Sequence, residues 1–160
     1  MSSAFSYCPA CARPLAARAA DGRLACACGY VHWDNPVPVV AAIVEHEGSV
    51  ILARNRAWPD PKMFGLVTGF LEKGETPEAA VRREVKEELD LEPLGAALVG
   101  IYPFARRNEL IIAYHVPARG AIRLNEELAD YRRIAPEKLR PWDFGTGLAV
   151  RDWLRKRGSE

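Results

Sequence analysis

The stretch Gly69–Leu91, GFLEKGETPEAAVRREVKEELDL, carries three glutamates, Glu84, Glu87 and Glu88, within five residues. In an α-helix, positions i, i+3 and i+4 lie on one face, so these three carboxylates would stand side by side. Beside them runs an apolar stripe with a spacing of four residues: Val81, Val85 and Leu89. The pattern predicts a helix that packs its apolar stripe on a sheet and lines the edge of that contact with negative charge.

The ends of this helix are marked by residues that favour helix starts and stops. Thr76 is a good N-cap, and Pro77 suits the first helical position because its missing N–H would have no partner there. Asp90 stands where a left-handed residue often ends a helix, and Asp tolerates that conformation better than most residues. The sequence therefore predicts a helix from Pro77 to about Leu89.

The rest of the chain alternates between apolar runs and turns, with no internal repeat or low-complexity tract. A loop is predicted at Ala57–Gly65, which contains two prolines, and a final helix from Thr146 to about Arg157. We expect that helix to bury Leu148, Trp153 and Leu154. The predicted strands are Val37–Glu45, Ser49–Arg54, Ala97–Tyr102, Leu110–Val116 and Tyr131–Ile134. This order predicts an α+β fold with a mixed sheet between helices, in which the continuously apolar first strand is covered on both faces.

The bulk properties exclude several classes of protein. The chain has 160 residues, and its formal net charge of +1 does not mark a non-specific binder of nucleic acid or membranes. No apolar run approaches the roughly 20 residues that a membrane span needs. The N-terminus has no basic region followed by an apolar core, so we expect no secretory signal and a cytoplasmic location.

The acidic helix face has two interpretations when the helix is taken alone. It is either a solvated face, partly neutralised by Arg82, Arg83 and Lys86, or a site for a hard cation. Mg²⁺ prefers oxygen ligands and takes a few carboxylates together with water. The residues before the helix decide between the two.

Residues Gly69, Glu75, Arg83-Glu84 and Glu87-Glu88 resemble the Nudix box of the Nudix hydrolase family, G-x5-E-x7-R-E-U-x-E-E-x-G-U, where U is a bulky aliphatic residue. The aliphatic positions are filled here by Val85 and Leu91. One position departs from the pattern, because Asp90 stands where the family has Gly. Since Asp90 removes no ligand, we expect it to affect stability rather than chemistry. The resemblance implies an α/β/α sandwich with a mixed sheet.

The resemblance also implies roles for the residues of the box. Nudix enzymes hydrolyse the pyrophosphate bond of nucleoside diphosphate derivatives with the help of Mg²⁺ or Mn²⁺. By resemblance, the ions are held by Glu84, Glu87, Glu88 and the carbonyl of Gly69. Glu75 and Arg83 are expected to be structural and to form an ion pair that ties the loop to the helix. The general base is either a box glutamate, Glu87 or Glu88, or a carboxylate of a later loop, for which Glu127 is the preferred match.

Aromatic and basic residues near the box are candidates for gripping the nucleoside. Stacking of a base on an aromatic ring contributes roughly 1–3 kcal/mol, so one or two such residues would suffice. For two of the candidates, Phe64 and Tyr102, a role in the core is an equally good interpretation. The candidates are Trp58, Phe64, Tyr102, Phe104 and, for a phosphate, Arg106.

All four cysteines of the chain, Cys8, Cys11, Cys26 and Cys28, lie within its first 28 residues. This clustering predicts a tetrahedral Zn²⁺ site rather than a disulfide framework, so we expect a zinc ribbon over residues 1–34 and the Nudix domain over 35–160. The second pair is one residue shorter than usual. If that pair cannot bind as it stands, His32 is the alternative ligand in place of Cys26.

With the ribbon, the chain is similar to the zinc-ribbon Nudix hydrolases, which implies FAD, ADP-ribose or NAD(H) as substrate class. Only Tyr102-Pro103-Phe104 matches the SQPWPFPxQS segment of NADH pyrophosphatases, so NADH is not favoured. The FAD and ADP-ribose group usually has Pro where this chain has Val67, and Trp where it has Phe64. The alternative function is a nucleotide-sensing module, or a nucleic-acid-binding one that uses the ribbon's arginines: Arg13, Arg18 and Arg23. The family also implies a homodimer.

Overall fold

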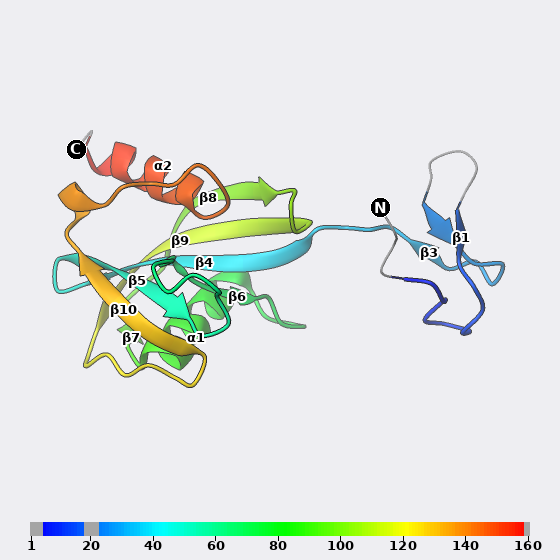
Figure 1. The fold of residues 1–160 in the computed structure, drawn as a ribbon, viewed down its shortest axis with the longest axis horizontal. Coiled ribbons are helices and arrows are strands. Elements are labelled where there is room, and N and C mark those ends of the chain that lie inside the picture. The colour runs from blue at the N-terminus through cyan, green and yellow to red at the C-terminus, as the bar shows by residue number, and fades with distance from the viewer. Residues whose placement is uncertain (1–4, 18–22, 159–160) are drawn as a thin grey trace. The chain divides into compact units, whose positions relative to one another are not determined.

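A computed structural model of the chain describes residues 5–17 and 23–158. The chain divides into two compact units, Met1–Pro36 and Val37–Glu160 (Figure 1). The first unit contains three short antiparallel strands in the order β1-β2-β3. Their bounds are β1 Ala16–Ala17, β2 Leu24–Ala25 and β3 Val31–His32.

The second unit is built on a seven-stranded mixed sheet. Its strands are β4 Val37–His46, β5 Ser49–Asn55, β6 Val67–Phe70, β7 Glu92–Pro93, β8 Ala97–Phe104, β9 Glu109–Arg119 and β10 Leu128–Ile134. The order is β10-β5-β4-β9-β7, with β6 on β4 and β8 on β9. The central pair, β4 and β9, is parallel, and the other pairs are antiparallel. Because β5 pairs with the end of β4 and β6 pairs with its beginning, the sheet divides along β4.

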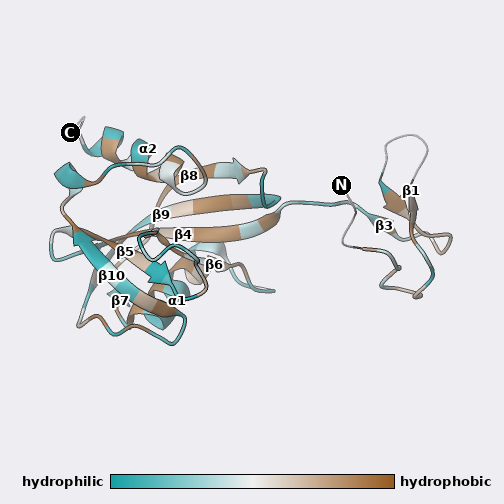
Figure 2. Ribbon diagram, in the orientation of Figure 1, coloured by the Kyte–Doolittle hydropathy of each residue, from teal (hydrophilic) through white to brown (hydrophobic). Residues whose placement is uncertain are grey.

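Two helices cover the two faces of this sheet, α1 (Pro77–Leu89) on one and α2 (Gly147–Arg157) on the other (Figure 1). Alternate residues of β4 supply both cores. Val40, Ala42 and Val44 pack with α1, and Ala41 and Ile43 pack with α2. All five are fully buried, and β4 and β9 are apolar along most of their length (Figure 2). The predicted α/β/α sandwich, with a first strand covered on both faces, is confirmed.

Helix α1 has the predicted bounds. The Thr76 hydroxyl accepts a hydrogen bond from the Ala79 N–H at 3.2 Å, and Pro77 occupies the first turn. Asp90 ends the helix in the left-handed region, with φ of 56°. Lys86 donates to the Asp90 carboxylate at 2.6 Å, which lowers the pKa of Asp90. Asp90 therefore performs the helix-ending role that Gly has in the box pattern.

Helix α2 differs from its prediction in what it buries. Trp153 is buried as expected, but Leu148 and Leu154 are only half-buried. Ala149 and Val150 are fully buried instead, because they face the sheet directly. The helix begins at Gly147, where a Cβ atom would lie 2.0 Å from the Trp142 carbonyl oxygen, so the close approach of this turn requires glycine. Within residues 5–17 and 23–158, no helix combines the length and apolar character needed to cross a bilayer.

Candidate metal centre on helix α1

Arg83 organises the carboxylates of α1 and the loop before it. Its Nε donates to Glu75 Oε1 at 2.9 Å, and its Nη1 donates to Glu84 Oε1 at 2.7 Å and to Glu87 Oε2 at 3.0 Å. Its Nη2 also donates to the Phe70 carbonyl at 3.2 Å. The expected Glu75–Arg83 ion pair is present, and it lowers the pKa of Glu75. One guanidinium thus links β6, the loop that carries Glu75 and two of the three glutamates on the helix, Glu84 and Glu87.

Glu88 has no comparable cation. It is 6% exposed, and its carboxylate forms no hydrogen bond or ion pair with the residues that the structure describes. Burial raises the pKa of Glu88 to about 8, with help from the charges of Glu84, Glu127 and Glu87. Burial also raises the pKa of Glu84, despite its bond to Arg83. A buried carboxylate among like charges fits a bound cation, because a cation removes both penalties.

The other basic residues of α1 do not neutralise Glu88. Lys86 pairs with Asp90, and Arg82 lies 3.8 Å from Glu78, one turn before it. Arg83 therefore neutralises two of the three glutamates, Glu84 and Glu87, whereas Glu88 has no cation among the residues described. This difference favours the hard-cation site.

Glycine is required at position 69 because β6 passes directly against Glu84. A Cβ atom on Gly69 would lie 1.8 Å from Glu84 Oε1, well inside any real contact distance. Any side chain there would push Glu84 out of its place. The backbone of Gly69 and the Glu84 carboxylate are consequently neighbours, which is the juxtaposition that a shared metal ion needs.

The loop between β9 and β10 brings Glu127 towards the glutamates of α1. The N–H groups of Arg123 and Asn125 donate to the last carbonyls of the helix, those of Leu89 and Glu88, at 2.9 and 3.2 Å. The Asn125 side chain then accepts from the Glu127 N–H at 3.1 Å. The charge of Glu127 contributes to the raised pKa of both Glu84 and Glu88, so the three carboxylates lie within electrostatic reach.

The predicted nucleoside-binding aromatics Trp58 and Phe64 lie on opposite faces of the sheet. Every second residue from Gly65 to Gly69 faces α1, as Val67 does in the core. The Trp58 ring lies against Gly65 on this face, because a Cβ atom on Gly65 would be 3.1 Å from it. Trp58 is therefore on the α1 face. Phe64 packs with the α2 core, and the Arg132 guanidinium stands 4.1 Å above its ring.

The other three candidates lie at the β8–β9 end of the sheet. Tyr102 is buried under α2 and donates its hydroxyl to Asp152 at 3.0 Å, which gives it a role in the core. Phe104 is half-buried and stacks on Phe144 with ring centroids 6.5 Å apart. Arg106 is exposed in the turn between β8 and β9. Phe144 was not predicted, because nothing in the sequence shows that its turn folds over Phe104.

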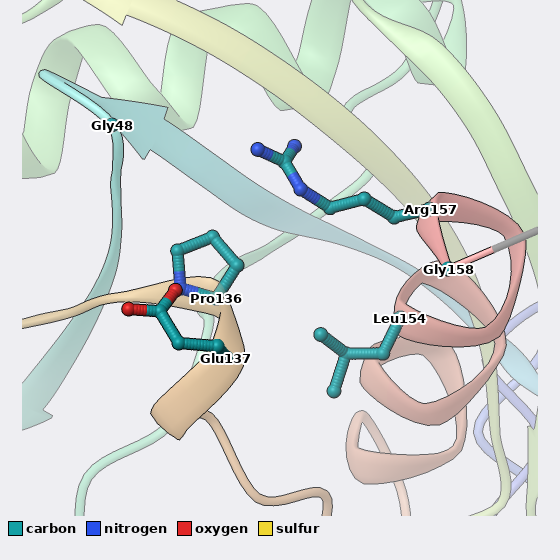
Figure 3. A pocket seen from close by; sticks show the side chains of 6 residues that line it. All are labelled: Gly48, Pro136, Glu137, Leu154, Arg157 and Gly158. Atoms are coloured by element: carbon teal, nitrogen blue, oxygen red, sulfur yellow. The ribbon is translucent and has the colours of Figure 1, made fainter. Parts of the chain in front are cut away.

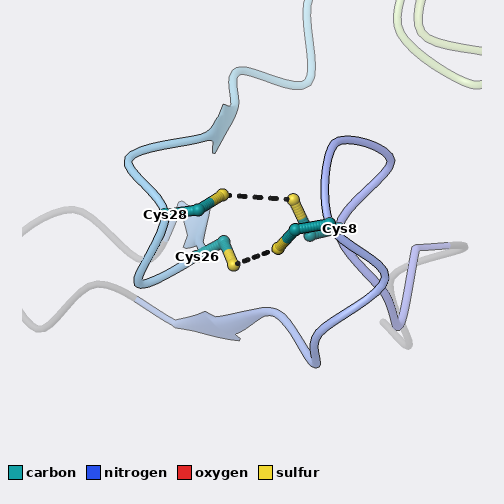
Figure 4. Close-up of side chains that lie close together, drawn as sticks. Cys8, Cys26 and Cys28 are labelled. Carbon is teal, nitrogen blue, oxygen red and sulfur yellow. Dashed lines mark hydrogen bonds between the residues drawn. The ribbon is translucent and has the colours of Figure 1, made fainter.

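The four cysteines of the first unit lie close together, and Figure 4 labels three of them, Cys8, Cys26 and Cys28. Their sulfur atoms all lie within 4.8 Å of one another, with Cys8 and Cys28 at 3.6 Å and Cys11 and Cys26 at 3.5 Å. Four thiolates at about 2.3 Å from a tetrahedral Zn²⁺ would be about 3.8 Å apart, so the donor set fits zinc. Hydrogen bonds from Arg13 help to lower the pKa of Cys11 to about 6, which favours the ligating thiolate.

The shortened second pair does not keep the Cys26 sulfur out of this cluster. The His32 ring instead lies 4.5 Å from the Phe5 ring, tilted by 40°, and its Nε2 is 3.8 Å from Asp34 Oδ1. Among the described residues, the cysteines are the one group of ligand atoms assembled this closely, and the α1 carboxylates are more widely spread. The two candidate sites therefore differ in how far they are preassembled.

A separate hollow lies at the end of α2, away from the predicted site residues (Figure 3). It has a volume of about 350 Å³. Its walls come from the β4–β5 turn, a short 3₁₀ turn at Pro136–Lys138 and the last turn of α2. The lining residues are Gly48, Pro136, Glu137, Leu154, Arg157 and Gly158. None of the box residues reaches it.

A family model described as "NUDIX domain" matches residues 35–153. The chain belongs to the Nudix hydrolase family. The match covers all strands of the seven-stranded sheet, helix α1 with the carboxylate site, and α2 as far as Trp153. The Nudix fold thus explains why a short loop and one helix carry most of the predicted chemistry.

Part of the chain is similar in sequence to curated relatives. NAD-capped RNA hydrolase NudC of Mycobacterium bovis is 35% identical over 62% of the chain and 32% of its own length. The protein of the same name from Stutzerimonas stutzeri is 30% identical over 81% of the chain and 48% of its own length. ADP-ribose pyrophosphatase of Methanocaldococcus jannaschii is 40% identical over 46% of the chain and 41% of its own length. The chain thus spans from about a third to about half of these relatives.

Solved structures agree on the fold. A Nudix hydrolase from Nitrosomonas europaea matches 97% of the chain and 93% of its own, with a TM-score of 0.81 and 21% identity. The Nudix domain of Shewanella oneidensis NrtR, solved with ADP ribose, matches 76% of the chain and 88% of its own, with a TM-score of 0.62 and 18% identity. At these identities, the similarity shows a shared fold and nothing about substrates.

Proposed function

We propose that the chain is a divalent-metal-dependent hydrolase of the pyrophosphate bond in nucleoside diphosphate derivatives of the FAD, ADP-ribose or NAD(H) class. The observation that carries this proposal is Glu88, a buried carboxylate without a cation, placed among Glu84, Glu87 and Glu127. Relatives that bear the names NAD-capped RNA hydrolase and ADP-ribose pyrophosphatase support the same class of reaction.

Each residue of the site has a part in this reaction. Glu84, Glu87, Glu88 and the Gly69 carbonyl would hold Mg²⁺ or Mn²⁺, and the ions would neutralise the diphosphate and activate water. Glu75 acts through Arg83, which fixes the direction of the box carboxylates. A general base must take a proton from the attacking water. The candidates remain Glu87, Glu88 and Glu127.

The test is a panel of substrates scored by product identity. Purified chain with Mg²⁺ or Mn²⁺ is incubated with FAD, ADP-ribose, NADH, diadenosine polyphosphates and nucleoside triphosphates. We expect a nucleoside monophosphate from at least one diphosphate derivative. The Glu87→Gln variant should lose this turnover, whereas Glu78→Gln, on the same helix but outside the site, should keep it. Absence of monophosphate from the whole panel would contradict the proposal.

Nucleic-acid binding by the first unit is a second candidate function. Tyr7 and Trp33 are 65% and 58% exposed there, and the Arg23 guanidinium lies 4.2 Å from the Trp33 ring centroid. Exposed rings with a nearby arginine are typical of surfaces on which unpaired bases stack. Binding of single-stranded RNA by the full chain should then fall as salt rises and should weaken in Trp33→Ala. The same change at Leu98, an exposed apolar residue of the other unit, should have no effect.

A further inference from the structure

The loop between β9 and β10, residues 120–127, is anchored where it begins and where it ends. At its start, the Gly120 carbonyl accepts a hydrogen bond from His46 Nε2 at 2.8 Å. Just after its end, Leu128 is buried in the core that α1 shares with the sheet. Because both ends are held, the position of Glu127 depends on the contacts of the loop's last residues.

The backbone of Glu127 is hydrogen-bonded on both sides. Its N–H donates to the Asn125 side-chain oxygen at 3.1 Å, and that oxygen also accepts from the Leu128 N–H at 3.2 Å. Its carbonyl accepts from the Arg56 N–H at 2.8 Å. The Nε of Arg56 donates to the carbonyl of Glu126, also at 2.8 Å. Asn125 and Arg56 thus hold the Glu126–Glu127 segment from its two sides.

The side chain of Glu127 has no support of this kind. It is exposed, and its carboxylate forms no hydrogen bond or ion pair within residues 5–17 and 23–158. The backbone therefore sets the direction in which the carboxylate projects. The ladder is irregular immediately afterwards, since Ala129 has no partner of its own on β5. Such bulges bend a strand, change the direction of nearby side chains and are common beside active sites.

Asn125 also connects Glu127 to the buried glutamate of α1. The Asn125 N–H donates to the carbonyl of Glu88 at 3.2 Å. Asn125 therefore bonds the backbone of Glu88 through its own backbone and the backbone of Glu127 through its side chain. The separation of these two glutamates depends on this one residue.

We propose that Asn125 and Arg56 are positioning residues that hold the Glu127 carboxylate beside Glu88 for its part in the hydrolysis. This inference rests on the proposed function and adds two residues from outside the Nudix box to its site. Neither residue needs to touch the substrate. Their contribution is precision, because misplacement of a reacting group by about 1 Å can cost about 100-fold in rate.

The test is a double-mutant cycle on kcat, with the full chain, saturating Mg²⁺ and the panel substrate that wild type hydrolyses fastest. Glu127→Gln should lower kcat about 100-fold, whereas Glu126→Gln, which alters the neighbouring exposed glutamate, should not. Asn125→Ala should lower kcat about 10-fold in wild type. In the Glu127→Gln background the same change should cost about 2-fold or less, since nothing remains to be positioned. A loss of fold would lower kcat in both backgrounds.

Three further variants separate the hydrogen bonds from other effects. Asn125→Ser keeps a side-chain oxygen that accepts the same N–H more weakly, so its kcat should lie between those of Asn125→Ala and wild type. Arg56→Leu keeps the backbone N–H and loses Nε, so its kcat should fall less, about 3-fold. The matched control is Asp60→Ala, because Asp60 Oδ1 accepts from the Lys62 N–H at 2.8 Å in the same kind of turn. Its kcat should equal that of wild type.

Amide hydrogen exchange, followed by nuclear magnetic resonance, tests the geometry without turnover. In Asn125→Ala, the N–H groups of Glu127 and Leu128 should exchange about 10-fold faster, because they lose the oxygen that accepts from them. In Asp60→Ala they should exchange as in wild type. Unchanged exchange in Asn125→Ala would show that the side chain does not hold the segment.

Two kinetic results would also overturn the inference. One is an Asn125→Ala variant that loses the same factor in kcat with and without the Glu127 carboxylate. The other is a Glu127→Gln variant that is as active as Glu126→Gln. Either result leaves the proposed hydrolysis intact, because wild type still releases monophosphate. An inactive wild type would remove the hydrolysis itself, and the role of Glu127 with it.

Discussion

The two candidate metal sites of the chain are built in opposite ways. In the first unit, four sulfur atoms already lie within 4.8 Å of one another, as a tetrahedral ion would hold them. On α1, Arg83 bonds Glu84 and Glu87 while Glu88 stays buried and unpaired. A structural zinc site is closed by protein ligands, whereas a catalytic site keeps positions open for water and substrate. This difference is the reason for proposing a structural role for the cysteines and an exchangeable ion at the glutamates.

The largest effect should follow removal of the charge on Glu88. Glu88→Gln keeps the size of the side chain but loses a ligand charge, so we expect turnover of the preferred substrate to fall about 100-fold or more. Steady-state rates at saturating Mg²⁺ measure this. Glu78→Gln, which alters an exposed glutamate of the same helix, is the matched control. Equal rates in the two variants would place the ion elsewhere.

The next effect concerns the cysteine cluster and should leave the α1 chemistry in place. Cys26→Ser should reduce bound zinc from about one ion per chain to a small fraction, because a tetrahedral site needs four ligands. His32→Ala should retain the ion, since the cluster is complete without His32. Elemental analysis of the purified variants measures both. Full zinc in Cys26→Ser together with loss in His32→Ala would reverse the ligand assignment.

A smaller effect should come from the backbone beside Glu84. Gly69→Ala places a methyl group where Glu84 now stands, so the carboxylate must move and we expect the metal affinity to fall about 10-fold. Gly95→Ala is the control, because a Cβ at Gly95 meets nothing within 4 Å. Titration of turnover with Mg²⁺ reports the change as a shift in half-saturation. An unchanged half-saturation in Gly69→Ala would show that Glu84 is not a ligand.

The smallest effect is a dependence of stability on pH in buffer without divalent metal. The folded-state pKa of Glu88, about 8, lies above its ordinary value of 4.5, so its contribution to stability is complete below about pH 4.5 and is lost as pH rises through 8. Glu88→Gln should therefore exceed wild type in unfolding free energy by about 1–3 kcal/mol at pH 8.5, and by much less near pH 5. Urea unfolding at both pH values measures this.

Addition of Mg²⁺ sharpens that test. The ion neutralises Glu88 in wild type, so the advantage of Glu88→Gln at pH 8.5 should shrink as Mg²⁺ is raised. The Glu87→Gln variant should not gain stability in the same way, because Glu87 is exposed and already paired with Arg83. A stability difference that does not vary with pH would show that Glu88 is not a buried ionised group.

The sequence could predict the elements whose signals are local. Helix α1 was predicted residue for residue, because Thr76, Pro77 and Asp90 act through their own backbone neighbours. The Glu75–Arg83 pair was also predictable, through the spacing of the box. The cysteine cluster followed from composition and clustering alone, although the shortened second pair left its geometry open.

The elements that were missed depend on partners far along the chain. Strand β6 (Val67–Phe70) has four residues and no alternating pattern, and β7 has two, so only their pairing with β4 and β9 defines them. Strands β9 and β10 are longer than predicted, since β10 continues to Leu128 through an irregularity. The placement of Trp58 and Phe64 on opposite faces, and the stacking of Phe144 on Phe104, likewise require the three-dimensional register.

Binding of Mn²⁺ to the carboxylates of α1 tests the central claim most directly. Electron paramagnetic resonance reports free Mn²⁺ during titration of the zinc-loaded chain, so it needs neither a substrate nor turnover. The account predicts saturable binding by wild type and Glu78→Gln that is weakened about 10-fold or more in Glu88→Gln. Equal Mn²⁺ binding by all three proteins, or none by wild type, would contradict it.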